Sequence, residues 1–287
     1  MDRTTLKRIN VLLVGQGKWA SNYVRTILAH KACNLSSHLG SRKLLAQLEK
    51  DNQFLNNLLE NQQIELIVIA IHPSYQKLIL EGIKKFDGQI ILEKPLINKK
   101  SHINFYEKLN LSIKNKIVVN HSHFFSMSFL KTLKDIKRLC PEKMYIKDYG
   151  NGPYRDGISP LMDWGPHAFG ICYYLNSSLE IVDLKKVSQK KSEKWLFKLK
   201  GNNIRDIKII TGNGFPRRNR SVVFFSKSMS ILKFELDKTE EVESPMSKIL
   251  SDAIDRIRHK KSDMGVHFTF NLALMASKAL LEIKNID

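Results

Sequence analysis

The stretch NVLLVGQGKWA, residues 10–20, joins an apolar run to a glycine turn and the start of an amphipathic segment. The apolar residues 11–14 predict a buried strand, and residues 18–30 predict a helix that begins directly after the turn. Glycines at such a turn let backbone N–H groups approach an anion such as a pyrophosphate, which the positive end of the helix dipole also favours. A glycine turn with a purely structural role is the alternative. The candidate dinucleotide-binding residues at this turn are Gly15, Gly17, Lys18 and Trp19.

The chain of 287 residues is strongly basic, with 47 Lys and Arg against 28 Asp and Glu and a formal charge of +19. This balance favours anionic partners, among them phosphorylated cofactors, sugar nucleotides and nucleic acid. A solvated lysine surface explains the same composition equally well. Composition therefore indicates an anionic ligand without choosing its class.

Targeting and cysteine signals point to a protein of the cytoplasm. No apolar run approaches the ~20 residues needed to span a bilayer, and the first residues lack the apolar core of a signal peptide. The three cysteines, Cys33, Cys140 and Cys172, show no C-x-x-C spacing. We therefore expect a reduced, soluble protein with no membrane partner, no disulfide framework and no metal site.

The segment after the second expected strand, residues 34–39, carries a signal for cofactor choice. A site that prefers NAD usually places an acidic residue on the ribose about 20 residues after the glycines. No acidic residue occurs here between Asp2 and Glu49. Ser41 and Arg42, with Lys43 as a further candidate, offer hydroxyl and cationic donors instead. These donors suit a 2′-phosphate and predict NADP(H), unless Arg42 is merely an exposed residue of a first helical turn.

Strands and helices alternate through the first 122 residues. The expected strands after the second are 66–71, 89–92 and 116–120, and the expected helices between them are 74–85 and 101–114. Continuous apolar runs of this kind are typical of parallel strands that are buried on both faces. We expect residues 1–122 to form a doubly wound α/β domain.

The pattern changes beyond residue 123. Helices are expected at 124–139, 160–175, 247–260 and 268–283, and strands at 193–199, 204–211, 220–225 and 229–236. Turn clusters separate the strand-like runs, which indicates a mostly antiparallel sheet. We expect residues 123–287 to form an α+β domain.

Two clusters of reactive groups stand outside the glycine turn. Lys94 follows an expected parallel strand at its carboxyl end, where α/β sheets bind ligands. Asp163 and His167 are four residues apart and share a helix face, and Pro166 between them predicts that this helix starts close to Asp163. Lysine with an imidazole and a carboxylate would handle protons at a carbinol or carbonyl. A turn lysine and a capping Asp beside a core His are the alternatives.

Taken in order, these motifs resemble the Gfo/Idh/MocA family of NAD(P)-dependent oxidoreductases. The resemblance rests on five motifs: the glycine turn, Ser41-Arg42, A-I-H-P-S at 70–74, E-K-P-L at 93–96 and D-x-G-x-H at 163–167. The resemblance implies a Rossmann domain followed by a domain whose open sheet carries the substrate site and an oligomer interface. It also implies hydride transfer between a nicotinamide and a carbon that bears oxygen.

The resemblance assigns roles to individual residues. Lys94 would be the catalytic lysine, His167 the proton donor or acceptor, and Asp163 a group that orients the substrate. Glu93 and Pro95 would shape the turn that aims Lys94, and the resemblance allows a cis Lys94–Pro95 bond there. His72 and Pro73 would join the cofactor site.

The substrate is the least determined feature. Tyr154, Arg155 and the loop 216–220, P-R-R-N-R, offer cations for a phosphate or carboxylate, although a solvated hairpin explains the loop equally well. An anionic sugar derivative therefore ranks ahead of a neutral polyol. Within the family, imine and tetrapyrrole reductases are further possibilities.

The sequence also departs from the family pattern. Gly170 stands where a further Asp is common, and the segment 120–123, N-H-S-H, lacks an arginine that the family often shows. These departures favour mildly a catalytically silent, dinucleotide-binding regulatory protein. Nucleic-acid binding has the charge it needs, but the sequence shows no stacking platform or recognised module, so we do not expect it.

Overall fold

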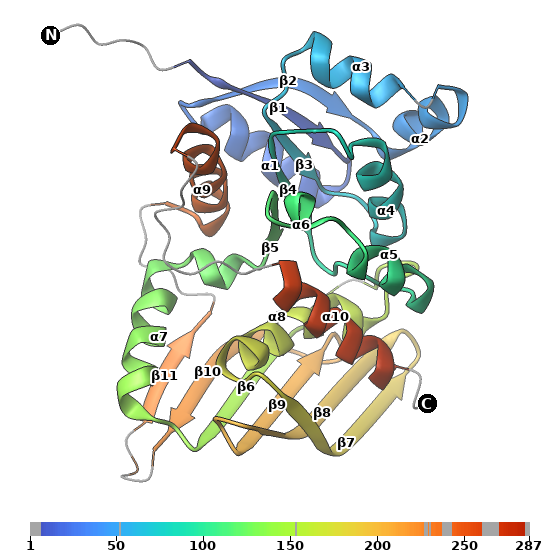
Figure 1. The fold of residues 1–287 in the computed structure, drawn as a ribbon. Helices are drawn as coiled ribbons and strands as arrows, with labels where there is room; N and C mark the ends of the chain where they lie inside the picture. The colour runs from blue at the N-terminus through green and yellow to red at the C-terminus, as the bar shows by residue number, and fades with distance from the viewer. Residues whose placement is uncertain are drawn as a thin grey trace, which may run out of the picture. The chain divides into compact units, whose positions relative to one another are not determined.

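The computed structural model describes residues 7–51, 53–152, 154–226, 229, 231–236, 243–259 and 270–284. The chain divides into two compact units (Figure 1). The first unit comprises residues 1–96, 101–122 and 243–270, and the second comprises 97–100, 123–242 and 271–287.

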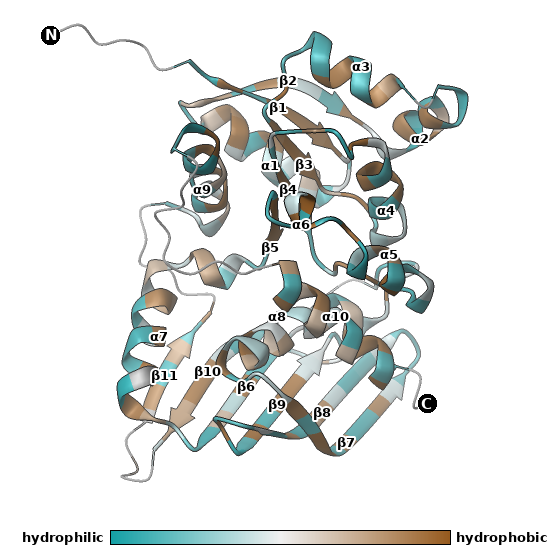
Figure 2. Ribbon diagram, viewed as in Figure 1, coloured by the Kyte–Doolittle hydropathy of each residue, from teal (hydrophilic) through white to brown (hydrophobic). Residues whose placement is uncertain are grey.

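The first unit is built on a parallel five-stranded sheet in the order β2-β1-β3-β4-β5. Its strands are β1 (Ile9–Val14), β2 (Cys33–Leu39), β3 (Leu66–Ile69), β4 (Gln89–Glu93) and β5 (Ile117–Asn120). Every residue of β3 and β5 is buried, and the inner strands are the brown ones in Figure 2. Burial on both faces explains the continuous apolar runs, and the doubly wound α/β class is confirmed.

The helices that follow these strands begin close to the expected positions. They are α1 (Lys18–Ala29), α2 (Ser41–Lys50), α3 (Phe54–Asn61), α4 (Pro73–Gly82), η1 (Lys100–His102), α5 (Ile103–Glu107) and α6 (Leu111–Lys114). The single helix expected at 101–114 is wrong, because the segment forms three short pieces. Asn110 interrupts it with φ −59° and ψ 142°, an extended conformation that asparagine adopts readily before a helix.

A helix from the end of the chain completes the first unit. Helix α9 (Pro245–His259) packs against α1, β4 and β5. The boundary expected after residue 122 therefore does not by itself separate the units, since residues 243–270 belong to the first one.

The second unit contains a six-stranded sheet in the order β11-β10-β6-β9-β8-β7. Its strands are β6 (Lys143–Tyr149), β7 (Leu179–Gln189), β8 (Ser192–Gly201), β9 (Asp206–Gly212), β10 (Asn219–Phe225) and β11 (Ile231–Glu235). Only the pair β6 and β9 is parallel among the paired strands of this part of the described chain. The mostly antiparallel sheet is confirmed.

Strand β6 was not expected from the sequence, although it lies inside the sheet. Its inward positions are Met144, Ile146 and Asp148, all buried. The third inward residue is an aspartate, so the apolar alternation that marks a half-buried strand stops after two positions. The buried charge of Asp148 thus explains why the apolar pattern did not predict this strand.

Helices cover one face of this sheet (Figure 1). They are α7 (Met127–Leu139), preceded by η2 (Ser122–Phe125), α8 (Pro160–Leu175) and α10 (Phe270–Ile283). Residues 268 and 269, expected in the last helix, and residue 260, expected in α9, lie outside the described part of the chain. None of the described helices has the length and apolar character that crossing a bilayer requires.

Helix α8 spans Pro160–Leu175, as the sequence pattern predicted, and so begins before the start near Asp163 that Pro166 suggested. Ser159 caps it by accepting a hydrogen bond from the Met162 N–H at 3.3 Å, and Pro160 occupies the first turn. Pro166 therefore lies inside the helix, and the prediction of a start near Asp163 is wrong. Proline lacks the N–H that would bond to the Met162 carbonyl. Most of α8 is buried, so packing against the sheet outweighs that lost bond.

Candidate functional site

The glycine turn of the first unit is built as a strand, a tight turn and a helix. Gly15 has φ +139°, and a Cβ on it would lie 2.3 Å from the Ala70 carbonyl oxygen. Gly17 precedes α1 with φ −78°, and a Cβ there would meet nothing within 4 Å. No side chain caps α1. Gly15 is thus required by the fold, whereas Gly17 leaves the N-terminus of α1 bare for an anion.

The end of β2 borders this turn. His38 contacts the Gly15 carbonyl oxygen through Nε2 at 2.6 Å. The Gln16 side chain lies so close to Gly40 that a Cβ on Gly40 would be 2.2 Å from it. Ser41 and Arg42 form the first turn of α2, with Arg42 exposed. The turn and the candidate 2′-phosphate donors therefore belong to the same edge of the sheet.

Glu93 is held inside the first unit by a buried polar network. Its Oε1 accepts a hydrogen bond from the Tyr23 hydroxyl at 2.8 Å and another from the Asn120 amide at 2.6 Å. The Gln76 amide donates to the Glu93 carbonyl oxygen at 2.9 Å. Burial, and then the charge of Glu93, raise the pKa of Tyr23 well above its usual range. The carboxylate of Glu93 thus fixes the end of β4.

Lys94 follows this network directly. The Lys94–Pro95 peptide bond is cis, as the resemblance allowed. Burial, together with the nearby charge of Lys94, lowers the pKa of His121 to about 3. His121 is therefore neutral at physiological pH, so the sequence departure at this position adds no second cation beside Lys94.

His72 and Pro73 act on the helix that follows β3. The backbone N–H of Ser74 donates to His72 Nδ1 at 3.3 Å, and Pro73 occupies the first turn of α4. Proline is preorganised for that position. These two residues form the start of the helix, and their predicted role toward a cofactor stays a prediction.

In the second unit, two of the predicted substrate-binding residues, Arg155 and Asp163, contact each other. Arg155 Nη1 lies 3.2 Å from Asp163 Oδ1, with 37% of the Arg155 side chain and 12% of the Asp163 side chain exposed. Tyr154 is exposed, and the ammonium of Lys191 lies 5.1 Å from the centre of its ring. Arg155 thus forms an ion pair with Asp163 while its side chain stays partly exposed.

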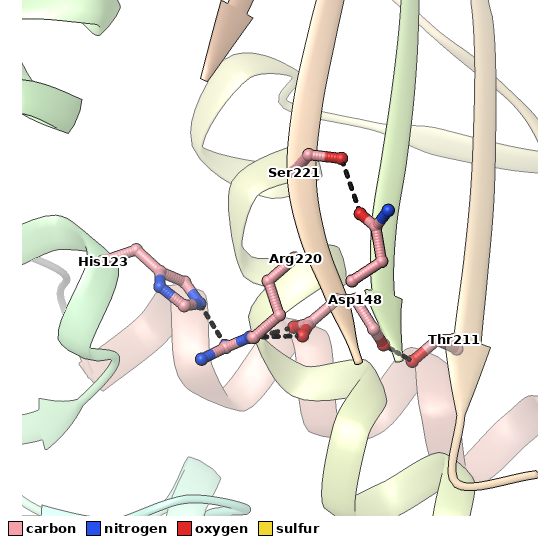
Figure 3. Close-up of polar contacts among 6 residues, drawn as sticks. His123, Asp148, Thr211, Arg220 and Ser221 are labelled. Atoms are coloured by element: carbon pink, nitrogen blue, oxygen red, sulfur yellow. Dashed lines mark hydrogen bonds and ion pairs between the residues drawn. The ribbon is translucent and has the colours of Figure 1, made fainter. Parts of the chain in front are cut away.

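His167 lies at the end of a chain of buried polar groups. Its ring centre is 4.4 Å from that of His123, with the two planes at 61°. Arg220 Nη2 lies 2.9 Å from His123 Nε2, and Arg220 Nε donates to Asp148 Oδ1 at 2.7 Å (Figure 3). Asp148 is fully buried, and the Thr211 hydroxyl donates to its backbone carbonyl oxygen at 2.8 Å. The series runs from β6 through β10 and η2 to α8.

Sequence reasoning did not find this series. Asp148 belongs to the unexpected strand β6, and His123 was noted only as a departure from the family pattern. Arg220 was interpreted as part of a cationic loop for an anionic ligand, whereas its side chain is 11% exposed and its guanidinium is paired with Asp148. The basic spacing of the loop could not reveal a partner 72 residues away.

The polar groups of each unit thus form local clusters. The first unit joins Lys94 to His121 and to the network of Glu93, and the second joins Asp163 to Arg155 and His167 to His123. Among the described residues, His, Cys, Asp and Glu form no group of three that could hold a metal ion.

Comparisons with known proteins show what the fold resembles. No protein-family model and no curated protein matches the sequence. UDP-N-acetylglucosamine 3-dehydrogenase GnnA from Acidithiobacillus ferrooxidans is 13% identical, with 98% of each chain covered and a TM-score of 0.69. Myo-inositol dehydrogenase from Corynebacterium glutamicum is 14% identical over 96% of each chain, with a TM-score of 0.71.

A third structure of this fold was determined with a cofactor. GenD2 from gentamicin A biosynthesis, in complex with NAD, is 13% identical, covers 98% of this chain and 94% of its own, and has a TM-score of 0.74. Identities this low establish the fold alone. The resemblance to Gfo/Idh/MocA oxidoreductases is therefore confirmed at the level of the two-domain fold.

Proposed function

We propose that the chain is an NADP-dependent oxidoreductase that moves a hydride between a nicotinamide and a carbon–oxygen centre of a sugar-like substrate. The observation that carries the proposal is the turn at Gly17, which presents the uncapped N-terminus of α1 in a fold that dehydrogenases share. A helix N-terminus with no side chain over it fits a pyrophosphate. Nothing else in the described unit requires a glycine at residue 17.

The proposed chemistry divides between a few side chains. The nicotinamide, when bound, supplies or accepts the hydride. Lys94, next to the cis peptide bond and the neutral His121, hydrogen-bonds to the substrate oxygen. His167 gives or takes the hydroxyl proton, and Asp163, oriented by Arg155, binds the substrate. Each role follows from the motif match and the local geometry of its own unit.

We propose NADP(H) as the cofactor because of the first turn of α2. Arg42 is exposed there and Ser41 begins the helix, while β2 and this turn contain no carboxylate. A guanidinium and a hydroxyl bind a phosphate dianion, whereas a bare ribose is held better by a carboxylate.

An anionic sugar derivative is the proposed substrate class. The overall charge of +19 supports it, as does the partly exposed cationic side chain of Arg155. A dehydrogenase of this fold is named for UDP-N-acetylglucosamine, which is a sugar of that kind.

We also propose a homo-oligomer through the second sheet, whose strands β7 and β8 expose Ile181, Val182, Val187 and Leu196. Light scattering after gel filtration tests the oligomer.

The deciding experiment is a titration of the purified protein with NADPH and NADH, followed by nicotinamide fluorescence. We expect NADPH to bind more tightly than NADH and Arg42→Ala to narrow this difference in affinity. Lys50→Ala, which removes an exposed cation from the last turn of the same helix, should leave the difference nearly intact. Equal affinities for the two cofactors would contradict the NADP assignment. NADPH consumption with keto-sugars and sugar nucleotides then identifies the substrate class.

A catalytically silent regulatory protein is the second candidate. The ion pair of Asp163 with Arg155 favours it, because that carboxylate already has a cationic partner. This candidate predicts tight NADPH binding with no turnover of any keto-sugar, whereas the proposed enzyme turns over a substrate and loses that turnover in Lys94→Ala.

A further inference from the structure

The second unit holds four polar side chains in a series that the motif match does not explain. Asp148 is fully buried, His123 is 3% exposed and His167 is 8% exposed. Arg220 connects the first two, with 2.7 Å from its Nε to Asp148 Oδ1 and 2.9 Å from its Nη2 to His123 Nε2 (Figure 3). Water has little access to these groups, so their hydrogen bonds constrain one another strongly.

The contact with Arg220 determines the protonation of His123. A guanidinium has five N–H donors and no acceptor. His123 Nε2 must therefore accept the hydrogen bond, which requires a neutral ring with its proton on Nδ1. A protonated His123 would turn an N–H donor and a positive charge toward Arg220.

Asp148 keeps Arg220 in place. A buried carboxylate requires a close cation, and Arg220 is the partner that β10 brings to β6, where the two residues stand opposite each other in the strand register. The Thr211 hydroxyl ties β9 to the same point through the Asp148 carbonyl. Strand pairing thus fixes the guanidinium, and the guanidinium fixes the His123 ring.

His123 in turn packs against His167 with ring centres 4.4 Å apart and planes inclined at 61°. A neutral neighbour lets His167 take up a proton without the repulsion that a second imidazolium at this distance would cause. The edge-to-face contact also restricts the orientation of the His167 ring.

We infer that His123 is a positioning residue for His167, held by Arg220 and Asp148 as a neutral imidazole with its proton on Nδ1. The consequence for catalysis rests on the proposed function, in which His167 handles the substrate proton. The constraint on the two rings does not depend on the proposed function, because it is a property of the folded chain.

The first experiment records ¹⁵N NMR spectra of protein labelled in histidine, with His123→Gln and His167→Gln used to assign the two rings. We expect His123 to show an unprotonated Nε2 and a protonated Nδ1 at pH 7, and His167 to show one ring environment. In Arg220→Gln, His123 should become a mixture of tautomers. A parent protein in which His123 is protonated on Nε2, or charged, overturns the inference.

Arg220→Gln leaves a buried carboxylate and can fail to fold. The double variant Asp148→Asn/Arg220→Gln removes both charges together and keeps the chain testable. It should again give a mixture of His123 tautomers. Arg217→Gln, in the exposed part of the same loop, should leave the spectra of both histidines as in the parent. An unchanged His123 tautomer in the double variant counts against the inference.

The second experiment measures turnover once a substrate is in hand. His123→Ala should lower kcat by about 10- to 100-fold and change KM little, because a misplaced catalytic group loses rate while the binding groups remain. His123→Gln, whose carbonyl accepts from Arg220 as Nε2 does, should recover most of the rate. A kcat for His123→Ala equal to that of the parent overturns the positioning role.

The two experiments separate the inference from the proposed function. The expected tautomers in a protein that binds no nicotinamide cofactor support the constraint on the rings and contradict the proposed function. Turnover with NADPH in a protein whose His123 carries its proton on Nε2 supports the function and overturns the inference.

Discussion

Replacing Tyr23 by Phe tests the buried network that fixes the end of β4. The hydroxyl of Tyr23 donates to Glu93 Oε1 at 2.8 Å and accepts from the Asn120 amide at 2.8 Å, and the whole side chain is buried. A hydrogen bond to a charged group contributes about 1.5–3 kcal/mol net. We therefore expect Tyr23→Phe to lower the free energy of unfolding of the first unit by about 1.5–3 kcal/mol. Urea unfolding monitored by circular dichroism measures it.

Tyr106→Phe is the matched control. Tyr106 is equally buried in the first unit, but its hydroxyl has no hydrogen-bond partner among the described residues. Removing it relieves an unsatisfied polar group, so stability should stay the same or rise. Equal losses in the two variants would refute the reasoning, because the effect would then come from packing rather than from the hydrogen bond to Glu93. Tyr23→Phe should also weaken NADPH binding if the position of Glu93 supports the turn before Lys94.

Four further predictions concern the first unit. Gly15→Ala should destabilise the protein by at least about 1–3 kcal/mol in urea, since φ is +139° and the Ala70 carbonyl blocks a Cβ. Gly17→Ala should keep parent stability but weaken NADPH binding in a fluorescence titration; unchanged affinity would remove Gly17 from the anion site. His121 has a pKa near 3 in the folded state and about 6.5 unfolded, so its contribution is complete above pH 6.5 and is lost as pH falls toward 3. The parent should therefore lose about 1.4 kcal/mol more than His121→Gln for each pH unit in that range, and parallel losses would contradict the burial argument. Lys94→Ala should lower turnover by about 100-fold with NADPH affinity retained, and a fully active variant would exclude Lys94 from the mechanism.

Local patterns allowed much of the first unit to be predicted. Apolar runs such as 66–69 are long enough to indicate buried parallel strands, and the glycine turn marks where β1 ends and α1 begins. The motif match allowed the cis bond at Lys94–Pro95. The same local logic failed where a polar residue is buried, as at Asp148 in β6, or where packing outweighs a helix breaker, as at Pro166 in α8.

By itself, the sequence determined the two-domain α/β architecture and the candidate residues of the glycine turn, Lys94 and His167, because these depend on spacing between near neighbours. Only the tertiary structure decided which buried polar groups pair. Glu93 bonds to Tyr23 70 residues away, and Arg220 meets Asp148 and His123 across 72 and 97 residues. Such pairs form when strand order and register bring distant side chains to the same buried point, where each charge must find a partner. The periodicity of the sequence does not indicate which of these distant residues pair.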